Sequence, residues 1–442
     1  MNLLRISLVD QPAKIVIWVL VFLVITLSLA LIIRSVRKVS ASGGKEARWV
    51  RIRAWAIVLG AAAVSGVACF AFEVWPNPYP DEVPWWIFVG VFGAMLALLG
   101  VLLLRGKRWA MALLAVVGVV STYLVANLTY QEHPNVASFF PSHVAEKVTY
   151  QEFSTLSRPP ERAGEPTGLI VKVPLAGTSS HFDARDAFAY VPPAYWRRGV
   201  QLPVLVLLSG SPGSPDNWFN SGDAATIARD YGREHGGVTP LMISVDGTGS
   251  TFDDPACSDG PTKKIHTYLA YDVPALIKDK FHVNPDQKTW AIAGLSYGGT
   301  CALHVVANAP DSYGMFVDFS GSYEALAGSK KQTIDKIFGG DAARFEQTNP
   351  ASIFRKAAKD RSPRFRHTEG IFVAGMTDSS AQQAQNKLAD LARRASVKVS
   401  VTTVPGGHSY GVWRRALRLV LPDIAAHGGI TETWSSEHAG ER

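Results

Sequence analysis

The pattern of apolar and polar residues divides the chain into two parts of different character. Within the first 127 residues there are four long apolar runs, at 15–33, 54–72, 85–104 and 109–127. The first run has 19 residues without a charge, enough for a helix to cross the hydrocarbon core of a bilayer. Its length and the lack of a cleavage-type flank argue against a removable signal peptide. We therefore expect four transmembrane helices in residues 1–127.

Beyond this part, shorter apolar runs alternate with helical stretches. Residues 128–167 contain a polar, proline-rich stretch and predict a linker. Strand-like runs follow at 169–173, 187–191, 204–208, 241–245, 290–293, 315–319, 371–374 and 397–404. Nearly all-apolar strands separated by helices predict a mostly parallel sheet covered on both faces, with the first two strands as antiparallel edge strands. We assign residues 168–428 to this α/β domain and 429–442 to a C-terminal tail.

The charge pattern suits a membrane protein better than a nucleic-acid-binding one. The net charge is +7, but the basic residues cluster beside the apolar runs. Residues 34–53 contain seven Lys or Arg and one Glu, and residues 105–108 contain three more basic residues. The charged residues of segment 73–84, by contrast, are all acidic. Since positive loops stay in the cytoplasm, both termini and everything after about residue 128 are predicted to be extracytoplasmic. No span contains a charge, which favours an anchor or partner-binding platform over a transporter.

One pentapeptide, Gly294-Leu295-Ser296-Tyr297-Gly298, stands between a strand-like run and a helical one. This strand–turn–helix context is typical of a nucleophile elbow, which exposes a serine hydroxyl. A second match to the same pattern occurs at 407–411, but too little chain follows it to supply an acid and then a histidine. The chain order Ser, acid, His therefore favours Ser296 as the nucleophile.

The other catalytic candidates follow from this order. His408, in a glycine-rich loop after the last strand, is the expected base that activates the serine. Asp378, after the preceding strand, is the expected acid that orients the imidazole. Asp318 is its rival, and Asp378 is also in position simply to cap the helix that follows it.

Further residues are assigned by their place beside these motifs. The backbone N–H groups of Tyr297 and Ser211 are the expected oxyanion donors. Cys257 and Cys301 are expected to form a disulfide, because both lie in the outward-facing domain near the same end of the sheet. Trp218 and Trp413 are predicted to contact substrate. No zinc-type spacing or phosphate loop is present, so neither a metal nor a cofactor is expected.

Four stretches together resemble the esterase D / antigen 85-type branch of the α/β-hydrolase superfamily: 203–210 followed by Asn217-Trp218, 268–277, 291–300, and 406–408 with Trp413-Arg414. The resemblance covers about residues 169–425. It implies an α/β-hydrolase fold and ester hydrolysis or acyl transfer through an acyl-serine, with Ser296 as nucleophile, His408 as base and Asp378 as acid. The chain departs from the family where Ser209-Gly210 replaces a frequent His-Gly or Asp-Gly. The four-span part lies outside the resemblance and looks like that of membrane-anchored hydrolases of high-GC actinobacteria.

These observations predict a membrane-anchored, extracytoplasmic serine esterase that cleaves an acyl ester or glycolipid of the cell envelope. An acyltransferase that passes the acyl group to a sugar, as mycolyltransferases do, shares every catalytic residue and remains open. A third hypothesis is a non-catalytic binding module on a hydrolase scaffold. The sequence predicts contact with the lipid bilayer, but it does not indicate which proteins bind to this chain.

Overall fold

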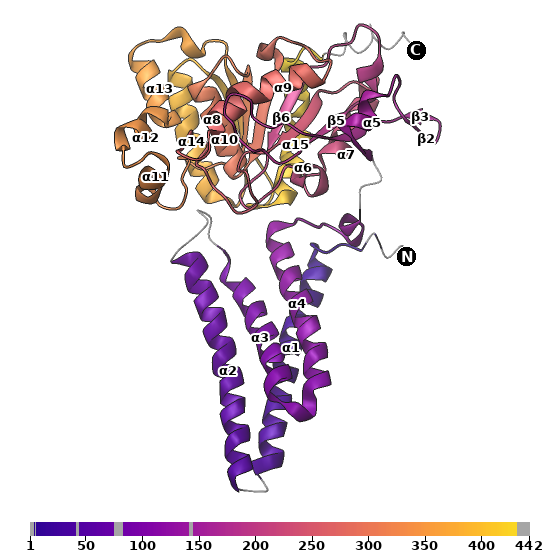
Figure 1. Ribbon diagram of the computed structural model, residues 1–442, viewed down its shortest axis with the longest axis vertical. Helices are drawn as coiled ribbons and strands as arrows, with labels where there is room; N and C mark the ends of the chain where they lie inside the picture. The colour runs from indigo at the N-terminus through magenta and orange to yellow at the C-terminus, as the bar shows by residue number, and fades with distance from the viewer. Residues whose placement is uncertain (1–3, 5, 41–43, 75–82, 141–144, 431–442) are drawn as a thin grey trace. The chain divides into compact units, whose positions relative to one another are not determined.

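The computed structural model describes residues 4, 6–40, 44–74, 83–140 and 145–430. The chain forms two compact units, Met1–Phe140 and Pro141–Arg442 (Figure 1). Most of the expected C-terminal tail, residues 431–442, lies outside the described residues, as do the acidic positions 81 and 82 between the second and third spans.

The first unit is built from four long helices. They are α1 (Gln11–Ser40), α2 (Gly44–Glu73), α3 (Trp85–Leu103) and α4 (Arg108–Tyr130). All four are long and apolar enough to cross a membrane. Only 17 to 39% of the most apolar window of each helix is buried inside the unit, so most of the apolar side chains face outward. Such an exterior is what the hydrocarbon of a bilayer would cover.

Helices α3 and α4 form a tight hairpin, because only four residues connect them. The short 3₁₀ segment η2 (Arg105–Lys107) joins them. A Cβ atom placed on Gly118 of α4 would lie 2.9 Å from the Cα of Ala94 on α3, so only glycine permits this approach. Small residues at such crossings let helix backbones pack closely where no hydrophobic effect drives association.

The second unit contains a nine-stranded sheet and a separate hairpin. The strands of the sheet are β1 (Glu146–Thr149), β4 (Leu169–Val173), β5 (Ala187–Val191), β6 (Val204–Leu208), β7 (Leu241–Val245), β8 (Ala291–Leu295), β9 (Met315–Phe319), β10 (Glu369–Gly375) and β11 (Lys398–Val404). They are arranged in the order β1-β4-β5-β7-β6-β8-β9-β10-β11. The hairpin pairs β2 (Glu161–Arg162) with β3 (Glu165–Pro166).

Helices connect the strands of the second unit. The α-helices are α5 (Tyr150–Ser154), α6 (Asn217–Asn220), α7 (Ala224–Glu234), α8 (Ile265–Thr267), α9 (Val273–Lys280), α10 (Tyr297–Asn308), α11 (Lys330–Ile337), α12 (Ala342–Thr348), α13 (Pro350–Lys359), α14 (Ser379–Arg394) and α15 (Tyr410–His427). Shorter segments of other helical types are η3 (Val136–Phe139) in the first unit and η4 (Pro193–Trp196), η5 (Tyr268–Asp272), η6 (Gln287–Thr289) and η7 (Pro363–Phe365) in the second.

The mostly parallel sheet predicted from the apolar strands is present, with one difference at its edge. β4 pairs antiparallel with β5, and β5 pairs antiparallel with β7, as expected for the first two strands. However, β4 is not an edge strand, because β1 pairs parallel to its other side. β1 and α5 lie within the range 128–167 that we expected to be linker. Val148 of β1 packs against the core, and this burial makes part of the expected linker a folded element.

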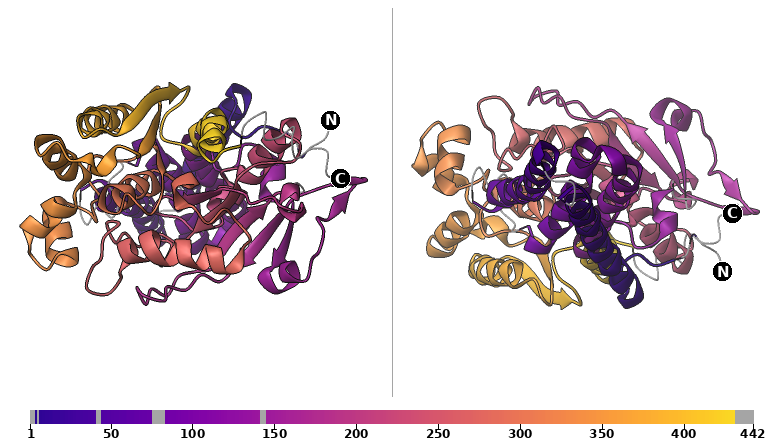
Figure 2. Two further views of the ribbon diagram at one scale, coloured as in Figure 1. Left: turned by 90° about the horizontal axis from the view of Figure 1, so that it is seen from above. Right: turned by 90° about the horizontal axis from the view of Figure 1, so that it is seen from below.

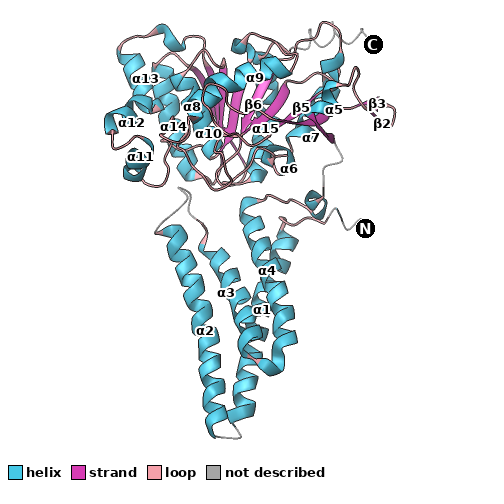
Figure 3. Ribbon diagram, in the orientation of Figure 1, coloured by secondary structure: helices cyan, strands magenta, loops and turns pink. Residues whose placement is uncertain are grey.

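Both faces of the sheet are covered by helices (Figures 2 and 3). The strand side chains alternate: Val206 and Leu208 of β6 join one core cluster and Leu205 and Leu207 join the other. Helices α9, α10, α13 and α14 contribute to the first cluster, and α6, α7 and α15 contribute to the second. This is the layered architecture of the α/β-hydrolase fold.

The sheet has a switch point at β6. β6 pairs parallel with β7 on one side and with β8 on the other. The strand that follows β6 in sequence is therefore added on one side of it, and the next strand, β8, is added on the opposite side. In open α/β sheets, ligands bind at the carboxyl ends of the strands beside such a point. The loops after β6 and β8, which carry Ser211 and Ser296, meet at this place.

Candidate active site

Ser296 occupies the turn between β8 and α10 in a conformation rarely adopted by residues other than glycine. Its φ is 52° and its ψ is −121°. The surrounding glycines allow the turn: a Cβ on Gly294 would collide with the backbone of Gly298, and a Cβ on Gly298 would collide with the carbonyl oxygens of Leu208 and Ser209. The strand, the sharp turn and the helix thus have the geometry of a nucleophile elbow.

His408 and Asp378 meet across the loops that follow β11 and β10. Nδ1 of His408 lies 2.8 Å from Oδ2 of Asp378, a hydrogen-bonding distance. The two strands are paired along their length, and Gly375 lets the β10 loop lie directly against the carbonyl oxygens of Gly406 and Gly407. In Ser-His-Asp sites the base contacts its acid through Nδ1, as His408 contacts Asp378 here.

Asp378 makes both of the contacts that the two alternative roles require. While Oδ2 contacts His408, Oδ1 accepts a hydrogen bond of 3.2 Å from the backbone N–H of Ala381 and caps α14. Burial raises the pKa of Asp378, but the hydrogen bond and charge of His408, together with the bonds from Ala381 and Ser320, outweigh burial and hold the pKa below its ordinary value. The carboxyl group is therefore an anion at neutral pH.

The rival acid, Asp318, has a different environment. It is fully buried in β9, where Oδ1 accepts hydrogen bonds of 2.6 Å from Gly321 N–H and 3.1 Å from the Gln385 amide. Burial, more than the nearby charge of Asp378, raises the pKa of Asp318 to about 7. Sequence reasoning missed Gln385, which is buried and also donates to the backbone carbonyl of Asp318. Its only sequence signal is a glutamine on an otherwise apolar helix face.

The loop after β6 passes directly beside the elbow. A Cβ on Gly210 would lie 2.9 Å from Cδ1 of Leu295 and 3.6 Å from Cβ of Ser296. Ser211 is fixed in this loop, since its hydroxyl donates a hydrogen bond of 3.0 Å to the carbonyl of Asp253. Two candidate oxyanion donors, Ser211 and Tyr297, thus belong to segments that adjoin the serine.

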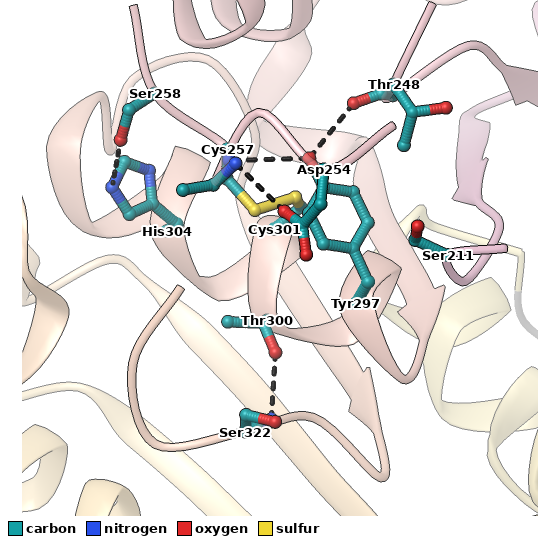
Figure 4. The surroundings of a disulfide bond; sticks show 12 residues. Ser211, Thr248, Asp254, Cys257, Ser258, Tyr297, Thr300, Cys301, His304 and Ser322 are labelled. Atoms are coloured by element: carbon teal, nitrogen blue, oxygen red, sulfur yellow. Dashed lines mark hydrogen bonds between the residues drawn. A yellow bond between two sulfur atoms is a disulfide. The ribbon is translucent and has the colours of Figure 1, made fainter. Parts of the chain in front are cut away.

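Tyr297 is held by its side chain as well as by the helix it begins. Its hydroxyl donates to the carbonyl of Gly247 at 3.1 Å and accepts from the N–H of Cys257 at 3.3 Å. Cys257 forms the expected disulfide with Cys301 of α10, with a Cα–Cα distance of 5.2 Å (Figure 4). The loop around Cys257 is therefore attached to the elbow helix by one covalent and one polar contact.

The two tryptophans predicted to contact substrate have other surroundings. Trp218 has no exposed surface, and its indole donates to the carbonyl of Leu208 at 2.9 Å. We therefore correct its assignment from substrate contact to core residue, since a large ring beside the buried Phe319 fills the space between α6 and the sheet. Trp413 is 5% exposed, and its ring stands edge-to-face against His408 with centroids 5.1 Å apart. It supports the imidazole from the side.

Two exposed apolar side chains at this end of the sheet were not singled out from the sequence. Phe252 follows β7 and Met376 follows β10, and they are 75% and 56% exposed. The Phe252 segment contacts the β6 loop through the hydrogen bond from Gly213 N–H to the carbonyl of Thr251. Both side chains are candidates for contact with a ligand bound at this end of the sheet. Among the described residues, no group of three His, Cys, Asp or Glu side chains is placed to hold a metal.

Comparison with known proteins gives matches to both the second unit and nearly the whole chain. A family model described as "Putative esterase" matches residues 180–424. A protein of Corynebacterium glutamicum described as uncharacterized is 43% identical over 392 residues, which cover 87% of this chain and 91% of that protein. A match of this length extends beyond the second unit into the four-helix unit.

Solved structures that align with this chain include an esterase. A ferulic acid esterase aligns with a TM-score of 0.52 and 19% identity, covering 59% of this chain and 99% of its own. MPT51 of Mycobacterium tuberculosis aligns with a TM-score of 0.43 and 18% identity, covering 60% of this chain and 99% of its own. The structural similarity to the ferulic acid esterase shows that this chain has the α/β-hydrolase fold.

Proposed function

Since this chain belongs to the esterase family and is a serine hydrolase, we propose that it is a membrane-anchored, extracytoplasmic esterase that cleaves an acyl ester of the cell envelope. Ser296 is the nucleophile, His408 the base and Asp378 the acid of this proposal. The observation that carries it is the 2.8 Å contact between His408 Nδ1 and Asp378 Oδ2, in a chain whose Ser296 has the backbone of a nucleophile elbow.

The proposed reaction has two halves. In the first, Ser296 Oγ attacks the ester carbonyl while His408 Nε2 takes the hydroxyl proton. The backbone N–H groups of Tyr297 and Ser211 stabilise the negative oxygen of the tetrahedral intermediate. The intermediate collapses to an acyl-serine, and the alcohol leaves with the proton from His408. In the second half, water gives a proton to His408 and attacks the acyl-serine, and the carboxylic acid leaves as Ser296 recovers its proton.

The membrane part of the proposal rests on composition and charge. The four helices are long and apolar enough to span a bilayer, and the basic residues concentrate in segments 34–53 and 105–108. The positive-inside rule puts these segments in the cytoplasm and the hydrolase unit outside. A membrane-impermeant protease added to spheroplasts tests this orientation, because it should cut the hydrolase unit without permeabilisation. Protection of the unit would contradict the orientation.

The acyl group is proposed to lie against Phe252 and Met376. Their loops follow β7 and β10, whose carboxyl ends lie at the same edge of the sheet as that of β8. Burying such side chains against an acyl chain removes apolar surface from water, which favours long-chain over short-chain esters. An ester with an apolar acyl group and a polar alcohol, such as a glycolipid, has this character.

The test uses the full-length protein in detergent with long-chain acyl esters, with and without trehalose as acceptor. Release of free acid that is lost in Ser296→Ala supports the esterase. Formation of acyl-trehalose in place of free acid supports an acyltransferase with the same residues. Neither product from a folded protein would contradict the proposal and favour a non-catalytic module.

A further inference from the structure

One cavity of the hydrolase unit lies away from the candidate active site. It has a volume of about 1160 Å³ and is lined by the β2–β3 hairpin, η4, the end of α7 and the turn before β7. Thr239 stands at the amino end of β7, which runs parallel to β6 and, through it, to β8. Ser296 stands at the carboxyl end of β8. The cavity therefore lies at the opposite edge of the sheet, and the proposed reaction does not use it.

The lining of this cavity is strongly basic. One carboxylate, Glu165, faces five arginines: Arg158, Arg162, Arg197, Arg229 and Arg233. Arg229 pairs with Asp230 at 2.7 Å, and Arg197 donates to the carbonyl of Gly236. The guanidinium groups of Arg158, Arg162 and Arg233 form no ion pair within the part of the chain that the structure describes. Their positive charges are therefore available to bind an anionic ligand or counterions.

Two nearly buried residues, Thr239 and Tyr190, also belong to the lining, and each is 1% exposed. Burial raises the pKa of Tyr190, and the charges of Arg229 and Arg233 oppose this shift, so both arginines act on its hydroxyl.

The lining also contains apolar side chains, namely Pro192, Pro193 and Trp196. The volume lies just above the usual range for small-molecule sites, so it exceeds what a single inorganic anion fills. A fitting ligand therefore combines an anionic group with a larger, partly apolar body.

We propose that this cavity is a second binding site, for a phosphorylated ligand whose phosphate is held by Arg158, Arg162 and Arg233. Arginine suits phosphate because its planar guanidinium donates two parallel hydrogen bonds, and a phosphate with two charges can engage several such groups. The same chemistry belongs to a free phosphorylated molecule and to the headgroup of an anionic phospholipid.

The test measures binding to the full-length protein in detergent by titration calorimetry. One probe is inorganic pyrophosphate, and the other is short-chain phosphatidylglycerol compared with short-chain phosphatidylcholine. The variant is the double substitution Arg162→Gln with Arg233→Gln. Arg198→Gln is the matched control, because Arg198 is exposed and adjoins Arg197 in sequence but does not line the cavity.

The native protein is expected to bind at least one of the two anionic probes. Loss of each charged hydrogen-bond donor should weaken binding about 10-fold or more, whereas Arg198→Gln should bind as the native protein does. Binding of pyrophosphate indicates a free phosphorylated ligand, and binding of phosphatidylglycerol alone indicates a lipid headgroup. The proposal is overturned if neither probe binds, or if Arg198→Gln weakens binding as much as the double variant while all variants keep the native unfolding temperature.

Discussion

Asp378 divides its two carboxylate oxygens between His408 and the first turn of α14. Oδ2 lies 2.8 Å from the imidazole, and Oδ1 lies 3.2 Å from the backbone N–H of Ala381. The same side chain thus orients the proposed base and caps the helix that follows it. A substitution at this position affects catalysis and stability through different oxygens, and the two effects are separable.

Asp378→Asn should lower kcat by about 10⁴-fold, the loss seen when the equivalent acid of a Ser-His-Asp site becomes an amide. It should leave stability nearly unchanged, because asparagine caps helices as well as aspartate does. Asp378→Ala should lose similar activity and also about 1 kcal/mol of stability. Steady-state kinetics and thermal unfolding of both variants check this. Equal unfolding temperatures for the two variants would contradict the capping role.

Asp318 should make the hydrolase unit less stable as the pH rises. The folded state raises the pKa of Asp318 from 3.8 to about 7, so it keeps a proton that the unfolded chain releases. The resulting stabilisation is complete below the unfolded pKa and is lost as the pH rises to about 7. Asp318→Asn cannot titrate and should lose less stability between pH 5 and 8 than the native protein does (values bracketing the pKa of about 7). Unfolding curves with the same pH dependence would contradict this assignment.

The disulfide should stabilise the loop that holds the Tyr297 hydroxyl. Cys257 and Cys301 are separated by 44 positions, and closing a loop of this size is worth about 4 kcal/mol on the chain-entropy model. The double substitution Cys257→Ala with Cys301→Ala should therefore lower the free energy of unfolding by several kcal/mol. Cys69→Ala, which leaves the bond intact, is the control. The prediction fails if reducing agent leaves the unfolding temperature of the native protein unchanged.

Phe252 and Met376 should set the preference for acyl chain length. Removing one apolar side chain that contacts the chain costs about 1.5 to 3 kcal/mol, which is about 10- to 100-fold in kcat/KM. Phe252→Ser and Met376→Ser should show this loss with long-chain esters and little loss with acetyl esters. Leu419→Ser, at an exposed position of α15, is the control. Equal losses for long and short esters would point to a structural effect instead.

Much of the fold followed from the chain's apolar pattern. The four long runs and the strands β4 to β11 were visible because buried parallel strands and membrane-length helices are nearly continuous in apolar residues. β1 was missed because its four residues, Glu146–Thr149, are mostly exposed and follow no strong alternation. It forms a strand only because β4 offers it a partner, which is a tertiary effect.

In the candidate site, too, features that depend on local sequence or on strand order could be predicted, whereas features that depend on contacts between distant segments could not. The turn at Ser296 could be predicted because it leaves a local signature, and the contact between His408 and Asp378 because strand order brings their loops together. Trp218 was misassigned because proximity in sequence to a motif does not tell whether a side chain points into the core. Gln385 and the basic cavity were missed because they depend on contacts between segments far apart in the chain.

The central claim is that Ser296 is an activated nucleophile. Full-length protein in detergent would be treated with a fluorophosphonate, and the labelled residue would be identified by peptide mass mapping. We expect the label on Ser296, its loss in His408→Ala, and its retention in Ser409→Ala, the serine of the second motif. A label on Ser409, or no label on a folded protein with an intact disulfide, would contradict the assignment.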